Sequence, residues 1–271
     1  MDRITMLGTG NALVTRCYNT CFVMDCGQER MLVDAGGGNG VLRQLEQAQI
    51  PVESIHTIYL THAHTDHILG MVWVLRMIAT AMRKGKYEGE LRFYAFAELI
   101  DAVRTICSLT LPRKLTWLFD HRILFIPVYD GDLRTIMGRQ MQFFDIQSTK
   151  ARQFGFTIGL ADGQKLICCG DEPLPQICLD YAAGCGWMMH EAFCLHSQAD
   201  IYSPYEKHHS TVKEACSLAQ ELEIPNLILY HTEDDNLNRR KELYTAEGRL
   251  YYHGSIYVPD DLDVIELTSG T

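Results

Sequence analysis

Long apolar runs are absent from this sequence of 271 residues. No segment approaches the roughly 18–20 consecutive apolar residues that a membrane-spanning helix needs. The first ten residues also lack the basic start and the apolar centre of a secretory signal peptide. We therefore expect a cytoplasmic protein that has no membrane partner.

The cysteine arrangement that a zinc ribbon needs is also missing. The ten cysteines are scattered along the chain, and the loose pair Cys17 and Cys21 is not followed by a second close pair. A chain of this length can bury a large core without covalent staples. We expect reduced and mostly buried thiols rather than disulfides.

The sequence has no surplus of basic residues. Lysine and arginine total 24 against 34 aspartates and glutamates, so the formal net charge is −10. This balance argues against a protein that grips nucleic acid through a broad basic face. It leaves room for a local basic patch or for a metal site that handles phosphates.

Apolar residues make up 47% of the chain, which excludes a disordered protein. No linker, repeat or low-complexity stretch divides it, so we expect a single domain over residues 1–271. The expected strands are 4–7, 21–24, 31–33, 55–60, 91–95, 227–230 and 263–267, and the expected helices are 41–48, 68–83, 98–109 and 211–222. Residues 123–169 are rich in strands that look like hairpins. This mixture predicts an α/β fold, an αββα sandwich of two mixed sheets covered by helices.

The densest chemical signal is the segment THAHTDH at positions 61–67, between an apolar strand and an apolar helix. Imidazole nitrogens and carboxylate oxygens are ligands that zinc, iron and manganese accept. His62 and His64 are two residues apart and can reach one ion together. Asp66 and His67 follow directly and can serve a second ion. The segment therefore predicts a metal site.

This segment resembles the His-x-His-x-Asp-His signature of the metallo-β-lactamase fold superfamily. Further motifs follow in the expected order over most of the chain: ITMLGTG at 4–10, which is similar to the ribonuclease Z branch, LVDAG at 32–36, CCGD at 168–171 and LILYH at 227–231. The resemblance implies that Asp171 bridges two metals and that His231 is the last ligand. It also implies that Asp34 supports the metal loop without touching an ion.

The resemblance implies two divalent ions, with zinc expected and manganese or iron as alternatives. The expected ligands are His62, His64 and Asp171 for the first ion, and Asp66, His67, Asp171 and His231 for the second. Relatives supply a third histidine to the first ion, but no histidine occurs here between His121 and His190. Gln147 stands nearest to the expected position and offers a weak, neutral carbonyl. We therefore expect the first position to be the weaker or the less filled one.

Two later motifs resemble the ribonuclease Z branch more closely. HEAF at 190–193 is similar to its His-Glu-Ala-Thr motif, with Phe193 in place of threonine, and HHST at 208–211 is similar to its His-Ser-Thr motif. The resemblance implies that His209 donates a proton to the leaving oxygen. His190 and Glu191 are expected to orient the pocket. Asp66 is expected to help orient the attacking water or to take its proton.

These parts favour a hydrolase, most simply a phosphodiesterase that acts on a small or cyclic phosphodiester. A tRNA 3′-processing ribonuclease is the alternative, but only 23 residues separate Gln147 from Asp171, where that enzyme carries a long arm that grips tRNA. A lactone or ester hydrolase and a non-catalytic metal-binding sensor also remain open. Lys150, Arg152 and Lys207 are candidate phosphate contacts. The resemblance implies a homodimer, because related phosphodiesterases are often dimers, and the Met-rich helix over 68–83 leaves room for a dimer or pocket contact.

Overall fold

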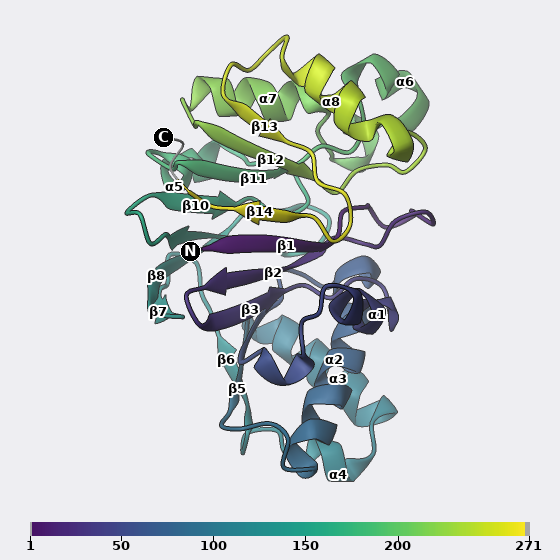
Figure 1. The fold of residues 1–271 in the computed structure, drawn as a ribbon, viewed down its shortest axis with the longest axis vertical. Coiled ribbons are helices and arrows are strands. Elements are labelled where there is room, and N and C mark those ends of the chain that lie inside the picture. The colour runs from purple at the N-terminus through teal and green to yellow at the C-terminus, as the bar shows by residue number, and fades with distance from the viewer. Residues whose placement is uncertain (1, 269–271) are drawn as a thin grey trace.

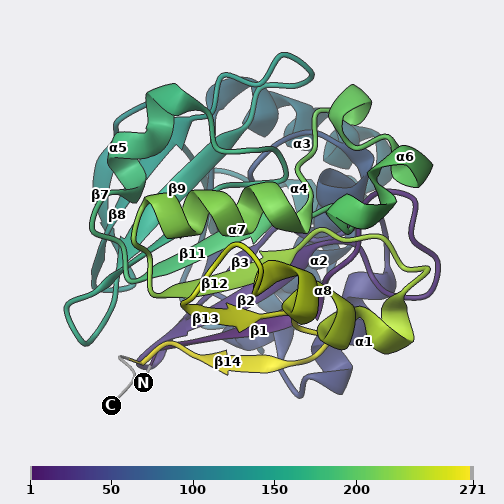
Figure 2. The same ribbon diagram turned by 90° about the horizontal axis from the view of Figure 1, so that it is seen from above.

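The computed structural model describes residues 2–268, and within them the chain forms two seven-stranded sheets packed face to face. Helices cover the outer face of each sheet, with α1–α4 on one side and α5–α8 on the other (Figure 1; Figure 2). The αββα sandwich predicted from the sequence is confirmed. A single domain over the whole chain stays a prediction.

The first sheet has the order β14-β1-β2-β3-β4-β5-β6. Its strands are β1 (Arg3–Gly8), β2 (Cys21–Cys26), β3 (Glu29–Val33), β4 (Thr57–Tyr59), β5 (Leu91–Ala95), β6 (Ile123–Pro127) and β14 (Val264–Glu266). Strands β1 to β3 pair antiparallel, and β3 to β6 pair parallel through helical crossovers. The helices on its outer face are α1 (Gly40–Gln47), α2 (Thr65–Arg83), α3 (Ala97–Thr110) and α4 (Arg113–Thr116).

The second sheet has the order β13-β12-β11-β10-β9-β8-β7. Its strands are β7 (Leu133–Ile136), β8 (Arg139–Asp145), β9 (Phe154–Gly159), β10 (Lys165–Cys168), β11 (Trp187–Glu191), β12 (Asn226–Tyr230) and β13 (Ser255–Tyr257). Strands β7 to β10 form antiparallel hairpins, as expected for the strand-rich middle, and β10 to β13 pair parallel. The helices that flank it are α5 (Leu179–Ala182), α6 (Ala199–Tyr202), α7 (Val212–Glu221) and α8 (Arg240–Gly248).

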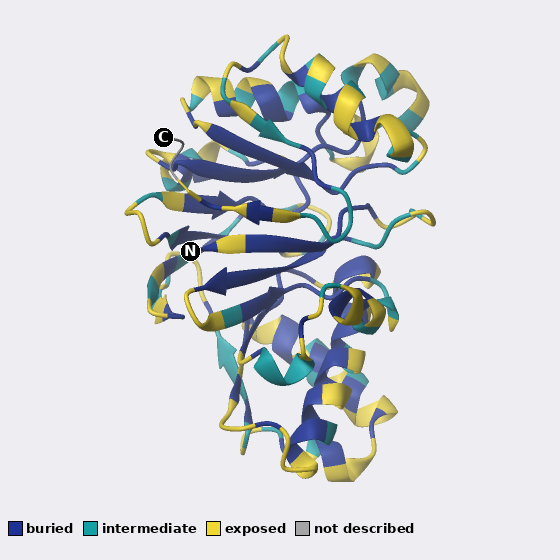
Figure 3. Cartoon of the chain, in the orientation of Figure 1, coloured by how far each residue is buried: buried dark blue, intermediate teal, exposed yellow. Residues whose placement is uncertain are grey.

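Alternating side chains of the second sheet divide between two apolar cores, because successive residues of a strand face opposite sides. On β12, Ile228 and Tyr230 belong to the large core that also holds the first sheet, whereas Leu227 and Leu229 pack with the helices outside. The strands are buried almost throughout and the outer helix faces are exposed (Figure 3). All ten cysteines are unpaired and nine are buried, in agreement with the expected reduced thiols.

The parallel strands give the site its location. Parallel neighbours have their carboxyl ends at the same edge of a sheet, and each of five strands ends here in a polar residue. Asp34 follows β3, His62 follows β4 after a short link, Asp171 follows β10, Glu191 ends β11 and His231 follows β12. The fold therefore collects residues from distant motifs along one rim of the sandwich.

One boundary differs from the sequence prediction in a way that matters for the site. Helix α2 begins at Thr65 instead of residue 68, with His64 as its N-cap residue in an extended conformation. Asp66 and His67 therefore lie in its first turn, where a carboxylate interacts favourably with the helix dipole. The apolar period that marked this helix starts only at Ile68, so the sequence pattern missed the polar first turn.

Among the described residues, no helix, including α2, is both long and apolar enough to cross a membrane. In α2, Met71, Leu75, Ile78 and Met82 are buried, as expected of core residues, while Leu69, Trp73 and Met77 are partly exposed along one stripe. The homodimer stays a prediction.

Candidate metal centre

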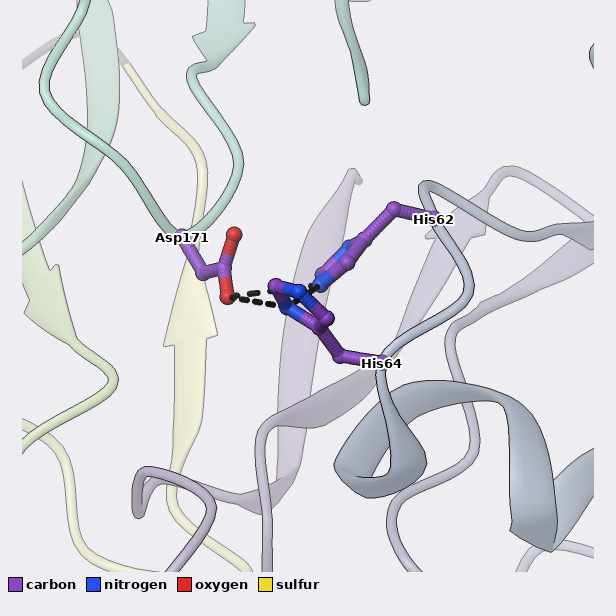
Figure 4. Close-up of side chains that lie close together, drawn as sticks. All are labelled: His62, His64 and Asp171. Atoms are coloured by element: carbon purple, nitrogen blue, oxygen red, sulfur yellow. Dashed lines mark hydrogen bonds and ion pairs between the residues drawn. The ribbon is translucent and has the colours of Figure 1, made fainter. Parts of the chain in front are cut away.

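One carboxylate oxygen of Asp171 lies among four imidazoles. Its Oδ2 is 3.4 Å from His62 Nε2 and 3.8 Å from His64 Nδ1 (Figure 4). The same oxygen is 3.6 Å from Nε2 of His67 and 3.6 Å from Nε2 of His231. These histidines come from two separate strand ends and from the first turn of α2. The aspartate thus joins the two halves of the cluster.

Two groups of ligand atoms contain only residues that the motifs predicted as ligands. His62, His64 and Asp171 form one, and Asp66, His67 and His231 form the other, with the ligand atoms in each group within 4.8 Å of one another. Glu191 and His209 form a third group at this spacing with His231. Asp66 Oδ2 lies 3.4 Å from Nε2 of His67 and 3.5 Å from Nε2 of His231. The residues that the motifs predicted as metal ligands are therefore adjacent in space.

The donor set fits divalent metal ions. It consists of imidazole nitrogens and carboxylate oxygens, which zinc and neighbouring transition metals bind. Among the residues that the structure describes, His67 Nε2, His231 Nε2 and Asp171 Oδ1 are buried without a hydrogen-bond partner. Buried polar atoms normally have partners, so these convergent atoms are suited to coordinate cations.

The electrostatics of the cluster keep its carboxylates ionised. Burial alone would raise the pKa of Asp171, but the imidazoles around it, His62 first, hold that pKa well below its usual range. Burial acts in the same direction on Asp66, and the nearby imidazoles of His231 and His67 lower its pKa instead. Two buried carboxylates that stay charged favour cations between them.

Asp34 fixes the orientation of the metal-facing imidazoles. His67 Nδ1 donates to Asp34 Oδ2 at 2.7 Å, so Nε2 is left to face Asp66 and Asp171. Thr61 donates to Asp34 through its backbone N–H at 2.9 Å and through its hydroxyl at 2.8 Å. The Thr61 hydroxyl in turn accepts from His62 Nδ1 at 2.9 Å. The role expected of Asp34, support without metal contact, agrees with this geometry.

We expect Asp34→Ala to weaken metal binding about 10–100-fold, because the imidazoles would lose the partner that fixes their tautomer. Competitive titration with a chromophoric chelator measures the effect. Asp34→Asn keeps an acceptor without the charge and should fall between Asp34→Ala and the unchanged protein. Equal affinity in all three proteins, each with an unchanged Tm, would contradict this role for Asp34.

A cavity of about 520 Å³ opens directly onto the cluster. Its walls include the metal-facing residues His64, Asp66, Asp171 and His231, the loop 11–13, and Lys150, Phe193, Lys207 and His209. The ring of Phe193 lies parallel to that of His209 with centroids 4.7 Å apart, and Lys207 Nζ lies 5.1 Å from the Phe193 centroid. Its size lies within the roughly 300–1,000 Å³ typical of small-molecule sites.

His209 is backed by a buried carboxyl group. Glu191 Oε1 accepts hydrogen bonds from the backbone N–H and the hydroxyl of Ser210, and Oε2 lies 3.7 Å from His209 Nδ1. Burial raises the pKa of Glu191 well above its usual range. Burial, followed by the charge of His231, lowers the pKa of His209 to about 3. The proton of this pair therefore rests on Glu191, beside an imidazole nitrogen that can accept it.

The comparisons with known proteins agree with this geometry. The family model described as "Anti-Pycsar protein Apyc1" matches residues 2–248. The chain belongs to the anti-Pycsar protein Apyc1 family. A curated relative, ribonuclease Z of Thermococcus sibiricus, is 25% identical over 310 aligned positions that cover 98% of this chain and 97% of the relative. Ribonuclease Z of Mycobacterium marinum is 23% identical over 98% of this chain and 99% of its own length.

Solved structures show the same fold. The metallo-β-lactamase fold protein YhfI from Bacillus subtilis superposes with a TM-score of 0.77 at 16% identity and covers 97% of this chain and 98% of its own. The short form of human tRNase Z has a TM-score of 0.74 at 20% identity, over 99% of this chain and 100% of its own. The predicted metallo-β-lactamase fold is confirmed, and the similarity to ribonuclease Z agrees with the branch that the motifs predicted.

Not every predicted residue of this Apyc1-family chain reaches the cavity. His190 is buried behind it, where Nδ1 donates to the Glu191 carbonyl at 2.7 Å and Nε2 accepts from Leu174 N–H at 3.4 Å. Arg152 is exposed and pairs with Glu98 and Asp145. His190 thus lies behind the cavity, and its expected role in orienting the pocket stays a prediction. Arg152 is not among the residues that line the cavity, and its phosphate contact stays a prediction as well.

Gln147 is also outside the cavity wall. It is exposed, with φ of 54°, and its backbone N–H binds the Asp145 side chain. Lys150 and Lys207, in contrast, line the cavity as expected for phosphate contacts. A ligand role for Gln147 stays a prediction.

Residues 11–13 line the cavity although no motif in the sequence marks them. Gly10 forms bridges with Asn19 and with Thr232, the residue after His231. These bridges hold the loop beside the cluster, and the exposed Leu13 lies at the cavity mouth. The glycine turn at 8–10 predicts the end of β1. Nothing in that turn indicates that Gly10 pairs with Thr232, beside the predicted ligand His231.

Proposed function

We propose that this Apyc1-family protein is a metal-dependent phosphodiesterase that acts on a small or cyclic phosphodiester. The observation that carries the proposal is the single cavity shared by the histidine–aspartate cluster, His209 and two lysines. Cations that bind a phosphoryl oxygen, a proton donor for the leaving oxygen and lysines for the remaining phosphate charge are the parts that phosphodiester hydrolysis needs.

Two divalent ions, which we propose to be zinc, would supply an acidified water and polarise the phosphoryl oxygen. The residues of the cluster would hold them: His62, His64, Asp66, His67, Asp171 and His231. Asp66 has a second task, because its ionised carboxylate lines the cavity and can orient the attacking water. Manganese and iron are the alternatives that the same donors accept.

His209 and Glu191 would deliver the proton to the leaving oxygen. The proton on His209 Nε2 passes to the leaving alkoxide, while His209 Nδ1 takes the proton of Glu191 Oε2, which lies 3.7 Å away. The Ser210 hydrogen bonds to Oε1 leave Oε2 as the protonated oxygen. His209 Nδ1 and Glu191 Oε2 are not hydrogen-bonded at this distance, so the relay requires them to approach each other when substrate binds.

The two lysines support an anionic substrate of limited size. Lys150 Nζ donates to the Lys207 carbonyl at 2.7 Å, and Lys207 Nζ donates to the Tyr202 carbonyl at 2.8 Å. These bonds hold both ammonium groups at one wall of the cavity. Their charge favours phosphate over a neutral ester or lactone.

A tRNA substrate is the second candidate. The curated relatives named ribonuclease Z favour it. Against it, residues 148–170 hold only a loop and the β9–β10 hairpin, without an arm that could grip tRNA. The net charge of −10 also gives little attraction to a polyanion. We therefore favour the small phosphodiester.

The deciding experiment compares substrates on one metal-loaded preparation. The panel contains cyclic mononucleotides, bis(p-nitrophenyl) phosphate, a tRNA precursor with a 3′ trailer, and a set of lactones. We expect the highest kcat/KM on a cyclic mononucleotide. Cleavage of the tRNA precursor alone would select the second candidate, and turnover of lactones alone would replace both. No turnover by protein shown to hold metal would favour a sensor.

A further inference from the structure

Gln153 is a buried polar side chain whose amide group is left unpaired. The residue is 0% exposed, and neither Oε1 nor Nε2 has a hydrogen-bond partner within residues 2–268. Burying an amide without partners is unfavourable, because it loses the hydrogen bonds that water would make. The amide therefore indicates a partner that is not part of the polypeptide.

Backbone contacts tie Gln153 to the strand end that carries the first histidines. The N–H of the next residue, Phe154, donates to the Thr61 carbonyl at 3.2 Å, one residue before His62. The Gln153 carbonyl accepts from the Ile146 N–H at 3.0 Å, so the loop 147–152 leaves the sheet between these two residues. Gln153 is thereby held beside the His62 end of the cluster, while the loop that contains Gln147 projects outward.

The segment that follows β10 also lies beside Gln153. The β9–β10 pairing ends with Phe156 opposite Cys168, and Gly170, the residue before Asp171, follows with a φ of 83°. Gly170 makes room for the amide: a Cβ at that position would lie 2.1 Å from Gln153 Nε2. Gln153 therefore packs between the two chain segments that carry His62 and Asp171.

We propose that Gln153 completes the first metal position in place of the histidine that relatives supply there. Its Oε1 is the added ligand to the ion held by His62, His64 and Asp171. An amide oxygen is a weaker ligand for zinc than imidazole, but burial and packing against Gly170 fix its position in advance. This inference rests on the metal centre of the proposed function and is independent of the substrate.

Metal binding tests the proposal without any measurement of turnover. The variants are Gln153→Leu, Gln153→Glu and, as the matched control, Gln147→Leu, which removes the same amide six residues earlier. Metal per chain is measured by elemental analysis after dialysis against graded chelator, and coordination is followed by the visible absorption of the cobalt-loaded protein. Circular dichroism and Tm establish that each variant is folded.

We expect Gln153→Leu to bind its more weakly held ion about 10–100-fold less tightly, with a changed cobalt spectrum. Gln147→Leu should match the unchanged protein, and Gln153→Glu should bind that ion more tightly because a carboxylate replaces a neutral amide. Two ions held with unchanged affinity in Gln153→Leu would overturn the proposal, as would loss of the ion in Gln147→Leu. If Gln153→Leu does not fold, unchanged affinity in Gln153→Glu overturns it. A protein that hydrolyses no phosphodiester but shows the expected losses would refute the proposed function and leave this inference standing.

Discussion

Asp171→Asn is expected to lower the kcat/KM for a phosphodiester about 10³-fold or more, since stabilisation by bound metal is worth several kcal/mol and each 1.36 kcal/mol is about tenfold in rate. The reason is the position of one oxygen. Asp171 Oδ2 lies within 3.8 Å of imidazole nitrogens from both halves of the cluster. Asparagine keeps the shape but removes the charge that would hold the two proposed cations together.

Metal analysis and steady-state kinetics on the same preparation check this result. The loss of metal should accompany the loss of activity, because we propose that this one residue serves both ions. Asp145→Asn is the matched control: that residue ends β8, which β9 separates from β10 in the same sheet, and it pairs with Arg152 away from the cavity. If the Asp171→Asn protein holds both ions and keeps its activity, the proposed role of Asp171 as a shared metal ligand is wrong.

His209→Ala is expected to lower kcat by about 10²–10⁴-fold on a substrate with a poor leaving group, the usual contribution of a positioned general acid. The metal content should stay unchanged, since His209 is outside both groups of proposed ligands. The loss should be much smaller on bis(p-nitrophenyl) phosphate, because p-nitrophenolate leaves without needing a proton. This contrast between substrates distinguishes a proton donor from a residue that only shapes the cavity.

The neighbouring histidine provides the control for that experiment. His208 is exposed, with φ of 57°, so His208→Asn suits a left-handed backbone position and should leave both rates unchanged. Equal losses of His209→Ala on the two substrates would show that His209 binds or positions the substrate instead. If His209→Ala leaves turnover of the substrate with the poor leaving group unchanged, the proposed proton relay is wrong.

Local patterns in the sequence were enough for most of the fold. The alternation of short apolar strands with amphipathic helices predicted the αββα sandwich, and the hairpin over 154–168 was visible from its turn at Asp162-Gly163. The start of α2 was missed because its first turn is polar. Apolar periodicity reports only the turns that face a core, and Asp66 and His67 face the metal centre instead.

Motifs located the candidate ligands, but contacts between distant segments decided the roles of the residues around them. Glu191 and His209 are 18 positions apart, and only the pairing of β11 beside β12 brings them within reach of His231. His190 and Glu191 are adjacent in the sequence yet act differently, because neighbouring strand residues face opposite sides. His190 accepts a hydrogen bond from the Leu174 N–H, whereas Glu191 lies beside His209 at the cavity.

The sequence by itself determined the donor chemistry: histidines and aspartates at the ends of apolar strands, with one expected histidine missing. Only the tertiary structure decided where the two glutamines near that gap lie. Gln147 was nearest by alignment with the motif, but its loop projects into solvent, whereas Gln153 is held between Thr61 and Gly170 with its amide buried. The physical reason is that strand pairing and burial fix where an amide points, and neither can be read from spacing along the chain.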